Sequence, residues 1–203
     1  MVRRTKAEAE KTRSQILDAA EDMFLEMGVT RTSLEVIARK ADVTRGAVYW
    51  HFRNKSDLID AMFDRVRMPQ DDMILEIASG EMDHALDLIE ETTLSVFNAL
   101  TQDEHRQRVF TILMHRIEGR DARTEGRQIA DRKILEKFIR CFEIAAEQGA
   151  LAPAWPAKTA AYATWMMVLG LMREWLESPE SFDLTEVGNG CVRQLFHSFR
   201  HSS

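Results

Sequence analysis

The 203-residue chain has only two cysteines and four prolines, and no apolar run long enough to cross a membrane. Cys141 and Cys191 each fall on an apolar helical stripe outside any CxxC or Cys/His spacing, which indicates reduced, buried thiols. The longest uncharged run, residues 159–172, is about 14 residues, against the roughly 20 of a membrane-spanning helix. The charged N-terminal segment lacks the apolar core of a signal peptide. We therefore expect a cytoplasmic protein with no membrane segment.

Recognisable catalytic motifs are also lacking. The sequence contains no nucleophile elbow, P-loop, dinucleotide fingerprint or zinc motif. His197 and His201 stand four positions apart and could share a helix face as metal ligands, but no third ligand accompanies them. We therefore expect no metal, no cofactor and no catalytic residue. A small helical enzyme that uses His115 as an acid or base remains an alternative.

The composition, with 45% hydrophobic and 30% charged residues, is that of an ordinary globular protein. Nearly every segment has helical periodicity and none has sustained strand alternation, so the predicted fold class is all-α. The periodicity predicts helices over residues 6–27, 33–41, a short stretch after Thr44, about 56 to before Pro69, 83–100, 104–118, 122–148, 158–177 and 183–200.

Two short helices joined by a tight turn are predicted near the N-terminus. Gly28 ends the first long helix, and Thr32 with Glu35 has the capping-box spacing that opens the next one. Asp42 falls in the turn, and the hydroxyl of Thr44 can cap the helix that follows. This arrangement is a helix-turn-helix.

One face of the helix after Thr44 is not needed for packing. At 100° per residue Val48 and Phe52 form the buried edge, while Gly46 and Trp50 point away from it. The flanking positions are Arg45, Ala47, Tyr49 and His51. A cation, a phenol and an imidazole beside a glycine suit contacts to a DNA groove and to phosphates. Residues 1–55 also carry a net charge of +3, against −9 for the remainder.

The segment TSLEVIARKADVTRGAVYWHFRNKSDL resembles the DNA-binding signature of the TetR family of bacterial repressors. The family pattern is met by Thr32, Ser33, Ile37, Ala38, Val43, Thr44, Gly46, Tyr49, His51, Phe52 and Lys55. FTILMHRIEG, GLMREWLESPESFDL and the overall length resemble the AcrR-like branch, which controls multidrug efflux genes. Asp42 departs from the pattern, because family members commonly have glycine in the turn; aspartate tolerates a left-handed backbone better than most residues.

The resemblance implies DNA-contact roles for eight residues. They are Thr32, Ser33, Thr44, Arg45, Gly46, Tyr49, His51 and Lys55. Arg45 is expected to contact a base in the major groove, with a phosphate contact as its alternative. Lys55 is expected to bind phosphate near a helix N-terminus, and the three hydroxyl residues can cap helices and touch phosphate. Tyr49 and His51 could instead cover the core, and Trp50 could pack on the first helix.

The remainder of the chain contains stripes of soft apolar side chains at helical spacing. The residues expected to line a ligand cavity are Phe97, Phe110, Thr111, Met114, His115, Phe138, Phe142, Trp165, Val168 and Leu169. Methionine and phenylalanine would suit a cavity that accepts varied shapes, and Thr111 and His115 would supply polar groups. Ordinary core packing is the alternative for each of the apolar residues.

The last predicted helix has a broad apolar face, which needs a partner. By resemblance, the last two long helices would pair with their copies in a homodimer, placing two recognition helices in successive major grooves. We thus predict a DNA-binding domain at 1–55 and a ligand-binding and dimerisation domain at 56–203. The predicted function is a repressor that binds double-stranded operator DNA and is released by a small hydrophobic or aromatic effector. A DNA-binding protein that needs no ligand is the alternative.

Overall fold

The computed structural model describes residues 6–66, 68, 73, 74, 77, 84–118 and 125–200, with the side chains of 115–118 and 125–134 left aside. Its helices are α1 (Lys6–Met27), α2 (Leu34–Lys40), α3 (Arg45–His51), α4 (Lys55–Asp64), α6 (Ala85–Thr101), α7 (Glu104–Glu118), α8 (Glu125–Glu147), α9 (Ala157–Glu177) and α10 (Leu184–Phe199). These described ranges contain no strand, so the all-α prediction is confirmed.

The chain divides into two compact units. The first comprises residues 1–66 and 108–124, and the second comprises 67–107 and 125–203. The segment predicted as the DNA-binding domain therefore falls in a unit that also contains α4 and the part of α7 from Arg108 onward.

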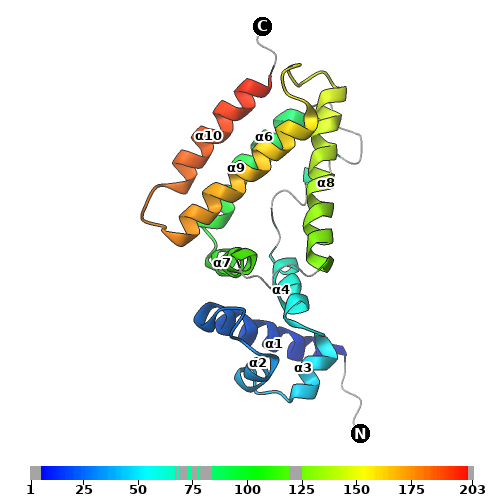
Figure 1. Cartoon of the computed structure of the whole chain (residues 1–203), viewed down its shortest axis with the longest axis vertical. Helices are drawn as coiled ribbons and strands as arrows, with labels where there is room; N and C mark the ends of the chain where they lie inside the picture. The colour runs from blue at the N-terminus through cyan, green and yellow to red at the C-terminus, as the bar shows by residue number, and fades with distance from the viewer. Residues whose placement is uncertain are drawn as a thin grey trace. The chain divides into compact units, whose positions relative to one another are not determined.

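The core of the first unit lies between α1 and the three short helices that follow it. α1 contacts α2, α3 and α4, as the blue and cyan ribbons of Figure 1 show. The helical stripe expected on α1 is buried at Ile16, Ala20, Met23 and Phe24. Because one long helix supports all three short ones, their positions relative to one another are fixed by apolar packing.

Four long helices of the second unit pack in a closed series: α6 contacts α8 and α10, and α9 contacts the same two helices (Figure 1). Aromatic rings fill one part of this core. Phe142 lies with its ring centroid 5.9 Å from that of Phe199, which in turn lies 4.8 Å from Trp155 and 5.1 Å from Phe196. Edge-to-face pairs of this kind add specificity to the burial of apolar surface.

Several helix ends differ from their predicted positions. Ser33, not Thr32, caps α2, because the Ser33 hydroxyl accepts the Val36 N–H. The capping-box assignment to Thr32 was therefore wrong. α4 ends at Asp64, before Pro69, and its N-cap is Asn54, whose side chain accepts the Asp57 N–H. The predicted cap of α3 is confirmed, since Thr44 accepts the Ala47 N–H.

Both cysteines are free thiols. Cys141 is buried, and this burial raises the pKa of its thiol to about 11. Cys191 is half-buried on α10. Within the described ranges, no helix combines the length and apolar character of a membrane span.

Candidate nucleic-acid interface

The turn between α2 and α3 is held by its backbone. The Val43 N–H donates to Ala38 O at 3.0 Å, and Asp42 has a positive φ of 53°. This left-handed conformation is the one that glycine adopts most readily. The turn therefore forms with aspartate in place of glycine, as the sequence predicts, at some conformational cost.

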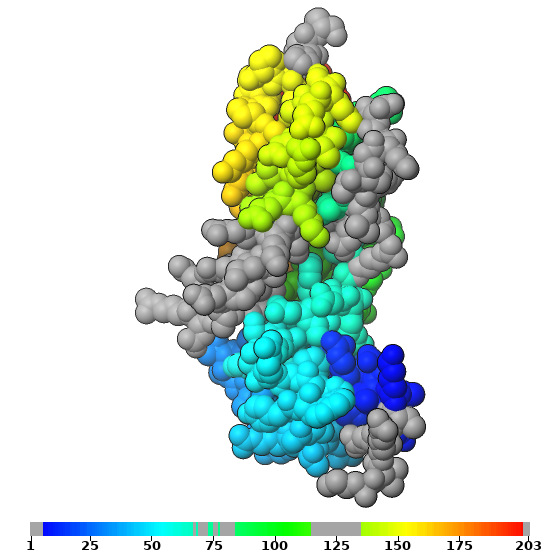
Figure 2. Space-filling view, turned by 90° about the vertical axis from the view of Figure 1, so that its right-hand side faces the viewer, coloured from blue at the N-terminus to red at the C-terminus, as the bar shows by residue number. Residues whose placement is uncertain are grey.

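α3 buries one edge and exposes the other, as the helical wheel predicts. Val48 is fully buried and Phe52 is 3% exposed, whereas Trp50 is 74% exposed and Tyr49 46% exposed. Trp50 does not pack on α1 and instead carries the most open large apolar side chain of the described residues. In Figure 2 the cyan atoms of α3 and the start of α4 form one continuous area of surface. This exposed side of α3 is available to a ligand.

The exposed side of α3 contains a cation held between two neighbours. The Nη1 of Arg45 donates to Oε1 of Glu35, on α2, at 2.5 Å, and the guanidinium lies 5.4 Å from the centre of the Tyr49 ring. Hydrogen bonding with Tyr49, followed by the negative charge of Glu35, raises the pKa of Arg45. From the sequence, Glu35 is predicted only as a capping residue, and no local pattern indicates its pairing with Arg45, ten positions away.

Lys55 and Thr32 fix the loop that precedes α2. The Lys55 ammonium donates to Val29 O at 2.6 Å and to Thr30 O at 3.2 Å. Thr32 is 1% exposed, and its hydroxyl donates to carbonyl oxygens of α1 and the following turn. The Thr32 side chain is therefore unavailable to a phosphate, because its surface is covered by protein. Ser33 and Thr44 are exposed caps.

His51 completes this face. It is half-buried, and its ring meets the Trp50 ring edge-on with centroids 4.5 Å apart. Gly46 is exposed, and a Cβ added there would meet only the Thr44 hydroxyl, at 3.9 Å. Of the eight predicted DNA contacts, six lie at the surface of α2 and α3: Ser33, Thr44, Arg45, Gly46, Tyr49 and His51. Lys55 is half-buried at the start of α4, and Thr32 lies in the interior.

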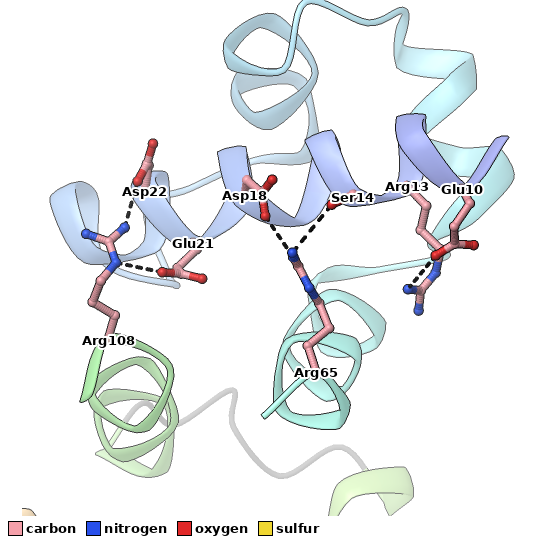
Figure 3. A network of polar contacts seen from close by, with 8 residues as sticks. All are labelled: Glu10, Arg13, Ser14, Asp18, Glu21, Asp22, Arg65 and Arg108. Carbon is pink, nitrogen blue, oxygen red and sulfur yellow. Dashed lines mark hydrogen bonds and ion pairs between the residues drawn. The ribbon is translucent and has the colours of Figure 1, made fainter. Parts of the chain in front are cut away.

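Two arginines bind carboxylates on one side of α1 (Figure 3). Arg65, which caps the C-terminus of α4, donates to Asp18 at 2.8 Å. Arg108, on α7, donates to Glu21 at 2.6 Å and to Asp22 at 2.7 Å. We call this pair of arginines and their carboxylates the α1 clamp. It joins α1 to both α4 and α7 within the first unit.

The residues predicted to line a cavity are divided between the two units. Phe110, Thr111 and Met114 belong to the first, where the Phe110 ring lies 5.8 Å from that of Phe63. Phe97 is fully buried in the second unit, against Gly188 of α10. The side chain of His115, and the whole of His201, lie outside the described residues.

The other predicted cavity residues lie on α8 and α9 of the second unit. Phe138 and Phe142 are buried with ring centroids 5.3 Å apart, and Phe138 lies 5.6 Å from Trp165. Trp165, Val168 and Leu169 are half-buried on α9. We call these five residues the α8–α9 aromatic group.

α9 and α10 each expose apolar side chains to solvent. Met166 is 52% and Tyr162 is 40% exposed on α9, and Val187 is 39% exposed on α10. The apolar face predicted on α10 is therefore only partly buried. Leu184, Val192 and Phe196 point into the unit, whereas Val187 remains open.

A helix-turn-helix whose second helix exposes an arginine, two aromatic side chains and a glycine is the architecture of a DNA-binding regulator. The comparisons with known proteins agree. Residues 16–62 match the model of the bacterial regulatory proteins of the tetR family, and residues 84–200 match that of the MAATS-type transcriptional repressor C-terminal region. The chain belongs to the TetR family, and it is a transcriptional repressor that binds operator DNA as a dimer.

Its relatives include proteins described as efflux repressors. The HTH-type transcriptional repressor BepR of Brucella suis is 39% identical over 202 residues, covering 98% of this chain and 97% of BepR. The crystal structure of NalD, the secondary repressor of the MexAB-OprM multidrug efflux pump in Pseudomonas aeruginosa, is 35% identical with a TM-score of 0.81, covering 98% and 100% of the two chains. SmeT of Stenotrophomonas maltophilia, solved in complex with triclosan, is 32% identical with a TM-score of 0.82 and coverage of 95% and 93%.

Proposed function

We propose that this chain represses genes of a multidrug efflux system in the cytoplasm and is released from its operator by a small hydrophobic or aromatic molecule. The observation that carries this proposal is the similarity, over nearly the whole of both chains, to NalD and SmeT, two repressors of multidrug efflux pumps. Similar proteins are named as transcriptional regulators, which favours a regulatory function over an enzymatic one.

The DNA-contact surface is formed by α2 and α3 in this proposal. Arg45 contacts a base edge, Tyr49 and His51 contact phosphate or base, and Gly46 lets the DNA backbone approach α3 closely. Trp50 joins this set because its ring is open to solvent. Ser33 and Thr44 offer hydroxyls and nearby helix N–H groups to phosphates.

Lys55 serves both the fold and DNA binding in this proposal. Its ammonium already donates to two carbonyl oxygens of the loop before α2. An ammonium has three N–H donors, so one remains for a phosphate oxygen. We propose that Lys55 binds phosphate while it holds this loop against the start of α4.

The effector-binding site lies, we propose, at the α8–α9 aromatic group. Phe138 and Phe142 offer ring edges and faces, while the half-buried Trp165, Val168 and Leu169 can change rotamer to admit a ligand. Phe110 lies beside Phe63 in the first unit, to which Thr111 and Met114 also belong, so the proposed site does not include these three residues.

The dimer forms through the open faces of α9 and α10 in this proposal. Met166 and Tyr162 stand one turn apart on α9, and Val187 adds an apolar side chain on α10. Apolar side chains this exposed are removed from water when two copies pair. The dimer then presents two α3 helices to major grooves about 34 Å apart.

A binding assay tests this function. Fluorescence anisotropy of labelled DNA from upstream of the chain's own gene and of neighbouring transporter genes should show saturable, salt-dependent binding of one or more fragments, and triclosan should reverse it. Binding without sequence preference would refute the repressor function. Specific binding that triclosan and a panel of hydrophobic aromatic compounds leave unchanged would support the ligand-independent alternative.

A further inference from the structure

Glu35 and Arg45 place opposite charges side by side on the exposed surface of the helix-turn-helix. Glu35 stands in the first turn of α2 and Arg45 begins α3. Their side chains are 59% and 62% exposed, respectively, although Nη1 and Oε1 are 2.5 Å apart. The pair therefore lies where a ligand of α3 can reach both members.

This pairing adds little to the stability of the fold. Exposed ion pairs contribute little to stability, because water screens the charges and two side chains lose freedom. What the contacts do achieve is orientation. Glu35 fixes Nη1 from one side, and the Tyr49 ring lies 5.4 Å from the guanidinium carbon on another. An arginine held in this way loses less freedom when it binds a ligand.

The chemistry of the pair is complementary to one base pair. In the major groove, guanine presents the acceptors O6 and N7, and its partner cytosine presents the N4 amino donor beside them. A guanidinium supplies donors for guanine, and a carboxylate accepts from cytosine N4. The second oxygen of Glu35 can do this while Oε1 remains bonded to Arg45.

We infer that Glu35 and Arg45 together read a single G·C base pair in each half-site of the operator. Arg45 donates to guanine, and Glu35 both positions Arg45 and accepts from cytosine. This inference rests on the proposed DNA-contact surface of α2 and α3. It makes Glu35 a specificity-determining residue, and its negative charge near the phosphates also weakens binding to unrelated DNA.

A base-pair scan of the operator with four proteins tests the inference. The proteins are the natural chain, Glu35→Ala, Arg45→Ala and the double variant, each measured against operators changed at one position of one half-site at a time. With the natural chain, changing one particular G·C pair should weaken binding about 5- to 150-fold, the effect of losing one good bidentate contact. Both single variants should lose this preference at that same position, and the double variant should show no further loss.

Glu26→Ala is the matched control, because Glu26 is an exposed carboxylate of the same unit on α1. Glu26→Ala should keep the preference for that G·C base pair. Thermal unfolding of Glu35→Ala should remain close to that of the natural chain, which separates recognition from folding. The inference is overturned if Glu35→Ala changes affinity equally for every operator, or alters preference at a different position from Arg45→Ala. A chain that binds no operator at all would instead refute the proposed function.

Discussion

At the scale of single residues, Lys55 shows how one side chain can serve the fold and the ligand together. Replacing Lys55 with alanine should weaken binding to every operator variant by a similar factor, because a phosphate contact carries no sequence information. The slope of log affinity against log salt concentration should become shallower by about two, since each subunit of the dimer releases about one counterion fewer. Titrations of labelled operator at several salt concentrations measure both. An unchanged slope would restrict Lys55 to holding the loop before α2.

Asp42 carries a local conformational strain that can be removed. Its φ of 53° lies in the left-handed region, where a side chain costs about 1 kcal/mol and glycine costs nothing comparable. Asp42→Gly should therefore leave the free energy of unfolding equal or raise it by up to about 1 kcal/mol, despite glycine's freedom in the unfolded chain. Asp42→Val should lower it, because a β-branched residue tolerates this region poorly. Urea denaturation gives the free energy of unfolding of the natural chain, Asp42→Gly and Asp42→Val. An Asp42→Val protein more stable than the natural chain would contradict the strain at Asp42.

Gly188 on α10 packs against the Phe97 ring of α6. A Cβ added there would lie 2.6 Å from the Phe97 ring. Gly188→Ala should lower the free energy of unfolding by about 1–3 kcal/mol, as overpacking does, although alanine favours helices. Phe97→Leu replaces the ring with a smaller aliphatic side chain, so the double variant should lose less stability than the two single losses added together. Strictly additive losses in chemical denaturation would show that the two side chains do not interact.

At the scale of helices, the sequence predicts most of the observed elements because their signals are local. Apolar periodicity predicted α1 and α7 at their observed ends, and the Thr44 hydroxyl predicted the start of α3. The cap of α2 was predicted one residue early, because Thr32 and Ser33 both carry a hydroxyl and only burial distinguishes them. Thr32 turns inward to bond with α1, which leaves Ser33 as the cap.

The candidate site was less predictable, since its members meet across long stretches of sequence. A helical wheel identifies the exposed side of α3, but it does not show that Glu35 of α2 reaches Arg45. Arg108 and Glu21 lie 87 positions apart, and no local pattern pairs them. The same limit explains the cavity residues: periodicity showed that Phe97 and Phe110 point inward, but not that they face Gly188 and Phe63.

The α1 clamp gives α7 a direct connection to the helix that supports α3. α7 begins in the second unit, and from Arg108 onward it belongs to the first. We expect Arg108→Ala to retain operator binding while reducing the factor by which triclosan weakens it. Residues along a coupling route typically change the coupling free energy by about 0.5–2 kcal/mol. Anisotropy titrations with and without saturating triclosan give this factor.

Arg140→Ala is the control for this variant. Arg140 also forms two ion pairs, but its partners Glu143 and Glu147 lie on its own helix, α8. Arg140→Ala should leave unchanged the factor by which triclosan weakens operator binding. Unfolding measurements on Arg108→Ala are needed as well, because Glu21 is 5% exposed and depends on its hydrogen bonds. If both arginine variants keep the full triclosan effect, the clamp has no role in release.

At the scale of the whole molecule, release requires that an effector bind more tightly to the form of the dimer that cannot hold DNA. We predict that an effector at the α8–α9 aromatic group shifts α4 and changes the separation of the two α3 helices, so that they no longer match grooves about 34 Å apart. A coupling of about 1–3 kcal/mol would lower operator affinity roughly 5- to 150-fold.

Two measurements examine this mechanism with triclosan as the probe. Val168→Trp fills space beside Trp165 on α9, so it should leave operator binding intact while abolishing release, which anisotropy detects. Linkage provides the reciprocal test, because DNA and effector must weaken each other's binding by the same factor. Calorimetric titration of triclosan into the free dimer and into the operator complex should therefore give affinities that differ by the factor seen in the DNA titrations. Equal affinities in the two titrations would exclude the mechanism and leave the second unit with dimerisation alone.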